Sequence, residues 1–227
     1  NANEVIANIA LMKMGHSLGD YAHLHPNDDV NRSQSTNDVY PTAMRLAIVS
    51  QCEAFSAAQT RLIAAFQERA AAFATIRKIG RTQLQDAVPM TLGQEFAGFA
   101  TTIREDVDII GRLKALLLEV NLGGTAIGTR VNTPDGYAEA AVAELSAICG
   151  MQVKLAGDLI EASSDCGAYV TFSGVLKRIA VKLSKICNDL RLLSSGPRSG
   201  FNEIRLPAVQ AGSSIMPGKV NPVIPEV

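Results

Sequence analysis

The sequence contains no tryptophan, and aromatic residues make up only 5% of its 227 residues. Hydrophobic residues nevertheless account for 47%, so any core must be aliphatic and rich in alanine. This length and composition are enough for one sizeable domain with a core of its own. An excess of charge is also missing, because 21 basic and 22 acidic residues leave a formal net charge of −1. Without a basic stripe, a nucleic-acid partner is not expected, and an anionic ligand would need local positive groups.

Paired cysteines and long apolar runs are absent as well. The four cysteines form no CxxC pair and are typical of reduced thiols in a cytoplasmic protein: Cys52, Cys149, Cys166 and Cys187. No stretch approaches the roughly 20 apolar residues of a membrane span, and the first residues do not resemble a signal peptide. We therefore expect a cytoplasmic protein with no membrane partner. Because the chain starts at Asn1 and ends in a continuing pattern, we also expect a piece of a longer polypeptide.

Three long segments instead carry apolar residues at alternating spacings of three and four. Residues 42–79 contain no glycine or proline, and the other two segments cover residues 94–122 and a stretch that ends at Ser195. Their apolar seams are Ile63, Phe66, Ala70 and Phe73; Phe96, Phe99, Ile103, Ile110, Leu113, Leu117 and Val120; and Leu176, Ile179, Leu183, Ile186, Leu190 and Leu193. Such spacing is typical of long helices that pack at small angles. Asp106 is a polar interruption of the second seam.

Shorter helices are expected at residues 4–14 and 137–148, and no segment alternates apolar and polar residues long enough to predict a strand. The sequence therefore predicts an all-α fold, a long-helix bundle. We expect a single central helical-bundle domain over residues 1–227 that is incomplete at both ends. Polar stretches containing glycine and proline connect the helices, and such connections often carry function: residues 23–41, 80–93, 121–136 and 196–222.

The stretch 212–222, GSSIMPGKVNP, combines groups suited to chemistry on an anion. Gly212 and Gly218 permit unusual backbone angles, so the loop between them could close over a substrate and exclude water. Ser213 lies in this loop, and Lys219 supplies a cation for a carboxylate. The alternative is an ordinary flexible connection, with Pro222 at the start of a helix. Spacing alone leaves both interpretations open.

Other polar stretches have simple structural interpretations. Residues 34–38, QSTND, are typical of a helix N-terminus, although hydroxyls and amides there also bind anions. Gly80 is expected to end the helix before it, with Arg81 and Thr82 either in a polar turn or in contact with an anion. Residues 123–129 predict a helix stop and a turn, since the lysine of a phosphate loop is missing. The histidines are expected to be structural, no group of side chains has metal-ligand spacing, and no GxSxG elbow indicates a hydrolase.

Together these stretches closely resemble the aspartase/fumarase superfamily. The stretch 212–222 resembles its long signature, and residues 35–38 and 80–86 resemble its other two blocks in the same order. Residues 25–31, HPNDDVN, and 123–129, GGTAIGT, are similar as well. The resemblance covers essentially the whole chain. It implies a lyase that eliminates a small group from a dicarboxylate without an organic cofactor, and it leaves open a divalent metal such as Mg²⁺ as an activator.

Within the superfamily, the chain is most similar to the aspartate ammonia-lyase branch. Gln83 stands where fumarases carry histidine, and residues 158–162 and 164–170 also resemble that branch. Hydroxide is a poor leaving group that needs a general acid, whereas ammonia leaves aspartate without one. The expected reaction is the reversible deamination of L-aspartate to fumarate. The alternatives are a class II fumarase and a truncated helical-bundle fragment without activity.

The resemblance also implies roles for individual residues. Ser213 corresponds to the general base that removes a proton from Cβ of the substrate. Lys219 and Asn221, with the backbone amide of Ser214, correspond to the groups that stabilise the resulting aci-carboxylate. The positions that orient the substrate are Ser35, Thr36, Asn37, Thr82 and Gln83.

The resemblance further implies an oligomer, because family members are homotetramers whose sites combine the three blocks from three subunits. The long apolar seams suit such an assembly. Two parts of the family pattern are missing from the sequence: a Gly-Thr-Ser/Thr loop expected before Asn1, and the C-terminal part of the central helices with the small domain that follows.

Overall fold

The computed structural model describes residues 1–227 as helices joined by loops and two short strand pairs. The helices are α1 (Ala2–Met14), the π-helix η1 (Pro26–Val30), α2 (Thr36–Ala72), α3 (Leu92–Leu117), α4 (Tyr137–Cys149), α5 (Leu159–Ser164), α6 (Gly167–Leu193) and α7 (Val223–Glu226). The strands are β1 (Arg77–Thr82), β2 (Gln85–Thr91), β3 (Glu119–Val120) and β4 (Lys154–Leu155). This architecture confirms the predicted all-α class with three long helices. None of the helices is both long and apolar enough to cross a membrane.

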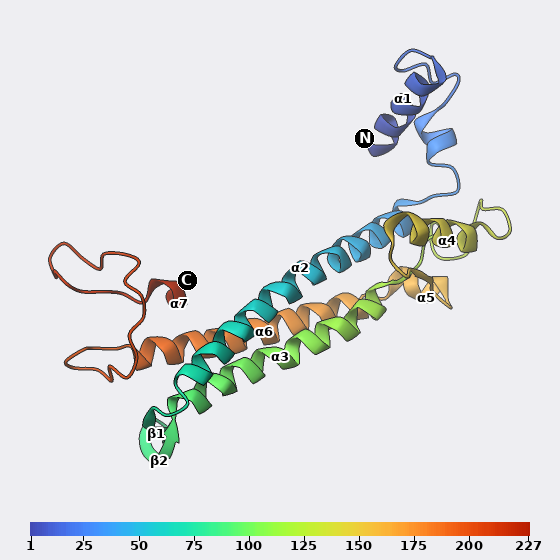
Figure 1. Ribbon diagram of the computed structural model, residues 1–227. Coiled ribbons are helices and arrows are strands. Elements are labelled where there is room, and N and C mark those ends of the chain that lie inside the picture. The colour runs from blue at the N-terminus through green and yellow to red at the C-terminus, as the bar shows by residue number, and fades with distance from the viewer. The chain divides into compact units, whose positions relative to one another are not determined.

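Two compact units make up the chain. Unit 1 contains residues 1–53 and 112–169, and unit 2 contains residues 54–111 and 170–227. The helices α2, α3 and α6, labelled in Figure 1, each contribute residues to both units. The expectation of a single domain over residues 1–227 stays a prediction.

The core of unit 2 forms where parts of α2, α3 and α6 run side by side (Figure 1). Phe66 of α2 lies edge-on to Phe96 and Phe99 of α3, with ring centroids 6.0 and 5.6 Å away. Ile186 of α6 closes the same cluster. The predicted seams therefore face the core, as amphipathic helices require; Leu176, which is 40% exposed, is an exception.

Asp106, the polar interruption of the second seam, is a buried and paired charge. Its side chain is 1% exposed, and its Oδ1 lies 3.0 Å from Nε of Arg178 and 3.0 Å from Nζ of Lys182. Both cations belong to α6. Burying a carboxylate is costly unless it is paired or hydrogen-bonded, so these ion pairs fix how α3 and α6 align within unit 2.

Unit 1 has a smaller aliphatic core around a parallel strand pair. Val120 of β3, Val142 of α4 and Val153, which precedes β4, form its buried cluster. In the β3–β4 pair, Val120 lies opposite Leu155. The turns that leave this core carry the chain from β3 into the glycine-rich stretch 123–129 and from β4 into α5.

The stretch between α2 and α3 corrects two predictions. We expected a polar connection without strands, in which Gly80 ends a helix; instead α2 ends at Ala72, and Gly80 lies inside β1 of an antiparallel hairpin. The two-residue turn is Gln83-Leu84, and both residues have positive φ, at 50° and 62°. Two-residue hairpin turns usually contain Asn-Gly or Asp-Gly. Because Gln83-Leu84 is neither, the sequence carries no turn motif that would predict the hairpin.

Candidate functional site

Ser35 is the residue before α2, and Thr36, Asn37 and Asp38 form the first turn of the helix. The hydroxyl oxygen of Ser35 accepts a hydrogen bond from the backbone N–H of Asn37 at 3.1 Å, which confirms the expected helix N-terminus. The side-chain amide of Asn37 donates to the carbonyl of Ala126 at 2.8 Å. The amide of Asn121 donates to the carbonyl of Asn37 and to the hydroxyl of Ser163, both at 3.0 Å. These bonds join the block to distant parts of unit 1.

Asp38 is the centre of this arrangement, although its sequence position is that of an ordinary acid at a helix start. Its side chain is completely buried. Oδ1 accepts from the backbone N–H of Ser35 at 2.9 Å, and Oδ2 accepts from those of Gly123 at 3.0 Å and Thr125 at 2.9 Å. Three backbone donors and the positive end of a helix thus stabilise the buried carboxylate. Burial, followed by the nearby charge of Asp38, raises the pKa of the Tyr137 phenol.

The glycine-rich stretch 123–129 needs its glycines because of close backbone packing. Gly123 has φ of 85°, and a Cβ there would lie 2.5 Å from Cβ of Ala138. Gly128 has φ of 89°, and a Cβ there would lie 2.3 Å from the carbonyl oxygen of Leu159. Both conditions exclude other side chains. The stretch is therefore a turn, as predicted, but one that packs against α4 and α5 and presents two N–H groups to Asp38.

A cavity of about 460 Å³ opens beside this block in unit 1. Thr36 and Asn37, two of the predicted substrate-binding residues, line it and are exposed. Ser163 and Ser164 of α5 line the same space, but their hydroxyls donate to the carbonyls of Leu159 and Glu161. The hydroxyls of Thr36 and Tyr40 and the second amide N–H of Asn37 remain as neutral donors of the kind that orient a carboxylate. The lining residues are Thr36, Asn37, Tyr40, Pro41, Ala126, Ile127, Ile160, Ser163 and Ser164.

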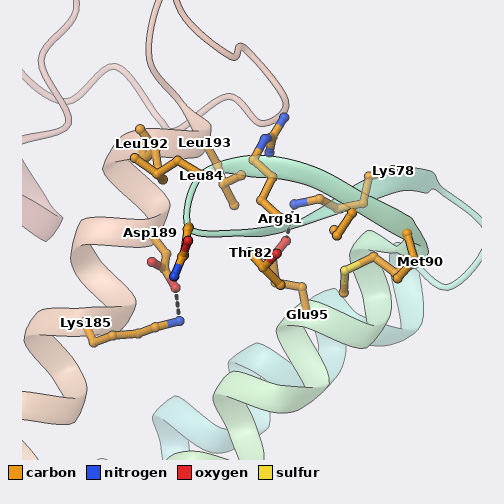
Figure 2. Close-up of a pocket in the computed structure, with 14 residues that line it drawn as sticks. Lys78, Arg81, Thr82, Leu84, Met90, Glu95, Lys185, Asp189, Leu192 and Leu193 are labelled. Carbon is orange, nitrogen blue, oxygen red and sulfur yellow. Dashed lines mark hydrogen bonds and ion pairs between the residues drawn. The ribbon is translucent and has the colours of Figure 1, made fainter.

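A second cavity, of about 470 Å³, lies in unit 2 between the β1–β2 hairpin and α6 (Figure 2). Thr82 and Gln83, the predicted residues of the second block, line it. Lys185 and Asp189 of α6 form an ion pair on its opposite side. Gln83 is therefore placed at a cavity wall by the turn of the hairpin.

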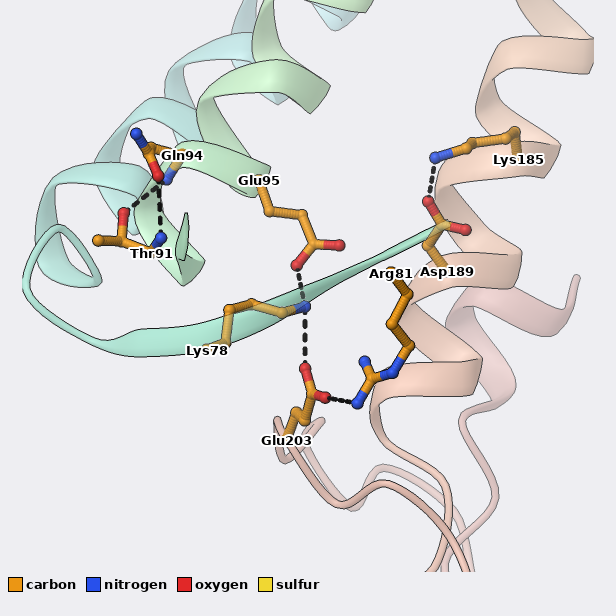
Figure 3. Close-up of polar contacts among 8 residues, drawn as sticks. All are labelled: Lys78, Arg81, Thr91, Gln94, Glu95, Lys185, Asp189 and Glu203. Carbon is orange, nitrogen blue, oxygen red and sulfur yellow. Dashed lines mark hydrogen bonds and ion pairs between the residues drawn. The ribbon is translucent and has the colours of Figure 1, made fainter. Parts of the chain in front are cut away.

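Two cationic side chains of β1, Lys78 and Arg81, belong to an ion-pair network (Figure 3). Lys78 Nζ lies 2.5 Å from Oε2 of Glu95 and 2.9 Å from Oε2 of Glu203. Arg81 pairs with the same Glu203, and its guanidinium stacks 4.1 Å from the ring centroid of Phe201. The charge of Arg81 is thus matched within the chain, which favours a structural role over contact with an anion.

Glu203 carries opposing electrostatic effects. Burial raises the pKa of its carboxyl, but hydrogen bonds from Arg81 and Lys78 outweigh burial, so the pKa lies below its ordinary value. Burial lowers the pKa of the Lys78 ammonium, but the bonds to Glu203 and Glu95 outweigh it, so that pKa is raised. Lys78 and Glu203 thus each favour the ionised state of the other.

The signature stretch 212–222 forms a closed loop in unit 2. The backbone N–H of Gly212 donates to the carbonyl of Lys219 at 3.1 Å, and Ala211 pairs with Val220 across the base of the loop. The hydroxyl oxygen of Ser213 accepts from the N–H of Ile215 at 3.3 Å. Ser213 and Lys219 thus lie near the base of the same loop, and a short helix follows Pro222.

The candidate residues fall into three groups. Thr36 and Asn37 share the first cavity and follow Ser35 at the start of α2, and Thr82 and Gln83 share the second cavity. The signature loop holds the third group: Ser213, Ser214, Lys219 and Asn221. Within unit 2, no hydrogen bond or ion pair joins the side chains of the third group to the residues that line the second cavity.

Asp38→Asn is expected to destabilise unit 1. The amide group of asparagine would face at least one of the three backbone N–H donors, and the negative charge at the helix N-terminus would be lost. We expect the free energy of unfolding to fall by about 1–3 kcal/mol. Urea unfolding measures the change, and Asp135→Asn, at an exposed position, is the matched control. Equal stability of the two variants would remove Asp38 from this role.

Glu203→Gln is expected to make stability less dependent on acid pH. Because the pKa of Glu203 is depressed in the folded state, its ion pairs stabilise the protein above the ordinary value of 4.5, and this stabilisation is lost as the pH falls through the folded value. The variant should therefore be less stable by about 1–3 kcal/mol at neutral pH and approach the wild type in acid. Denaturant unfolding across this pH range tests it, with exposed Glu144→Gln as the control. A pH-independent difference would contradict the ion-pair interpretation.

Comparisons with known proteins agree with these blocks. The sequence matches the model of a lyase family, Lyase_1, over residues 1–227. It is 66% identical to an aspartate ammonia-lyase of Pseudomonas aeruginosa and 60% identical to that of Escherichia coli, in each case over all of this chain and 48% of the relative. The chain therefore spans about half the length of the curated relatives it matches.

Solved structures give the same result. A crystal structure described as fumarate lyase:delta crystallin from Brucella melitensis, bound to cobalt, matches with a TM-score of 0.96 and 68% identity, over 99% of this chain and 49% of the other. A recombinant class II fumarase from Schistosoma mansoni matches with a TM-score of 0.91 and 36% identity, over 99% and 50%. From the three blocks, the fold and the match over residues 1–227, the chain belongs to the lyase family of the aspartase/fumarase superfamily.

Proposed function

We propose that the protein to which this chain belongs is an aspartate ammonia-lyase, which converts L-aspartate reversibly into fumarate and ammonia without an organic cofactor. The identity of 60–66% to curated aspartate ammonia-lyases, over the whole chain, is the observation that carries the proposal. The class II fumarase that matches is only 36% identical.

Gln83 supports ammonia over water as the leaving group. It lines a cavity at the hairpin turn, next to Thr82. A glutamine side chain can orient a substrate by hydrogen bonds but cannot donate a proton to a departing hydroxide. An ammonium group on aspartate leaves as neutral ammonia, so no general acid is needed at this position.

The proposed reaction begins at the signature loop. The alkoxide of Ser213 takes the proton from Cβ of aspartate, and the electron pair of the C–H bond moves into the neighbouring carboxylate. Lys219, Asn221 and the amide of Ser214 stabilise the extra charge of this aci-carboxylate. The electron pair then returns to form the Cα=Cβ bond, and the Cα–N pair departs with ammonia.

The three groups of residues would form one site in a homotetramer. Hydroxyl and amide groups of Ser35, Thr36 and Asn37 would orient a carboxylate, and Thr82 and Gln83 would face it from another subunit. Exposed apolar side chains on α2 and α6 supply surface for such an assembly, because large exposed apolar patches mark contact sites. Among these side chains are Met44, Phe55, Val170, Leu176 and Val181.

Substrate choice separates the proposed enzyme from a fumarase. The purified protein, assayed by ultraviolet absorbance of fumarate, should form fumarate from L-aspartate and release one ammonia per fumarate. L-malate should give no fumarate at the same enzyme concentration. Turnover of malate with aspartate untouched would overturn the proposal in favour of a fumarase, and inactivity toward both in a correctly folded, oligomeric protein would favour a non-catalytic role.

Ser213→Ala is expected to abolish turnover and leave aspartate binding nearly unchanged, because the general base contributes to proton transfer and little to the ground state. A loss of at least about 10²-fold in kcat is expected. Ser214→Ala keeps its backbone amide and should lose far less. Steady-state kinetics with an isothermal binding measurement checks both variants, and retained turnover in Ser213→Ala would exclude Ser213 as the base.

A further inference from the structure

The turn that follows α1 gathers three side chains with metal-ligating atoms. One such atom from each of His16, Asp20 and His23 lies within 4.8 Å of the others. Nδ1 of His16 lies 3.4 Å from Oδ2 of Asp20, and Nδ1 of His23 lies 3.1 Å from the same oxygen. The imidazole rings stack with centroids 3.9 Å apart. The sequence did not predict this group, because its spacing of four and three spans a turn and not a single helix.

Neighbouring residues hold this turn in place. Gly15 ends α1 with φ of 85°, and the N–H of His16 donates to the carbonyl of Leu11 at 2.9 Å. Asn8 of α1 accepts from the N–H of Gly19 at 2.7 Å and donates to the hydroxyl of Tyr21 at 3.2 Å. Asn8 therefore holds the backbone before Asp20 and the side chain of Tyr21 after it. A metal site needs such support, because outer contacts hold the ligands in their binding geometry.

The donor set is typical of a borderline divalent metal. Two imidazole nitrogens and one carboxylate oxygen are a known zinc ligand set, which leaves a fourth position for water. In a tetrahedral site with bonds of about 2.1 Å, ligand atoms lie about 3.4 Å apart. The Nδ1–Oδ2 distance is 3.4 Å for His16, and it is shorter, 3.1 Å, for His23. Mg²⁺ and Ca²⁺ prefer oxygen ligands, so the imidazoles select against them.

The surroundings are accessible to an ion from solvent. The side chains of His16, Asp20 and His23 are 30%, 34% and 52% exposed. The third histidine differs, because Nδ1 of His25 accepts from the N–H groups of Asn27 and Asp28 at 3.2 Å and caps η1. Two histidines are thus available to an ion, and one is used by the backbone.

We propose that His16, Asp20 and His23 form a binding site for a divalent metal of the Zn²⁺ or Co²⁺ class, with water at the fourth position. Bound metal joins both ends of the turn between α1 and η1. Its effect is to stabilise this part of unit 1, and it takes no part in the proposed elimination reaction. The site is independent of the proposed function.

Co²⁺ titration of the purified, metal-free protein tests the site. A Cys166→Ser background removes the exposed thiol, which is another ligand for this ion. We expect one Co²⁺ per chain with the visible bands of a tetrahedral nitrogen and oxygen site, competition by Zn²⁺, and a melting temperature that rises with Zn²⁺ concentration. Absence of binding, or spectra with thiolate charge-transfer bands, would overturn the proposal.

Variants assign the binding to these residues. Asp20→Asn and His23→Gln should each weaken Co²⁺ binding at least tenfold and remove the thermal shift. His25→Asn is the matched control, because asparagine can still accept the two capping hydrogen bonds, and it should bind as the wild type does. Equal affinity in all variants would identify an adventitious surface ion and exclude the site. Circular dichroism of each metal-free variant establishes that the fold is retained.

Discussion

The buried carboxylate of Asp38 is the interaction on which the candidate residues of unit 1 depend. It has no cationic partner among the hydrogen bonds and ion pairs of the structure; three backbone N–H groups take that place. Two of these groups come from the glycine-rich turn and one from Ser35. A single acid therefore joins a helix start to a turn that lies more than 80 residues later in the sequence. Because the bonds are made to the backbone, they fix the direction of the chain at the start of α2, where Thr36 and Asn37 line the cavity.

In unit 2, an acid also connects distant segments, but it does so through ion pairs and not through hydrogen bonds to the backbone. Glu203 holds Lys78 and Arg81 of the hairpin through charge, and Phe201 adds a stacking contact to Arg81. Ion pairs of this kind respond to pH and salt, whereas the backbone bonds of Asp38 are buried. In both units, an acidic side chain organises the segment that carries the polar groups of the candidate site.

The long helices were predictable, because their apolar residues repeat at a regular spacing along the sequence. Seams such as Phe96, Phe99 and Ile103 bury one helix face, and a spacing of three and four is visible without any structure. The hairpin was missed because its turn, Gln83-Leu84, has no glycine, and tertiary contacts of β1 with Glu203 hold what the local sequence does not favour. Asp38 was missed because an acid at a helix start usually caps that helix, and only the fold shows that its partners lie in a distant turn. The block motifs named the candidate residues, but the way these residues come together depends on contacts between distant segments and, in the proposed tetramer, between copies of the chain, which no local pattern encodes.

The two-residue turn of the hairpin has a consequence for how lyase chemistry can diversify. Residues at a hairpin tip contribute no rung to the strand ladder and bury little surface, so exchanging one polar side chain for another there costs the scaffold little. A left-handed backbone at Gln83 also suits residues such as histidine and asparagine. In the proposed enzyme, the position beside the leaving group is thus separated energetically from the positions that keep the protein folded. Substrate preference can drift at this tip while the long helices, and the assembly they would support, stay the same.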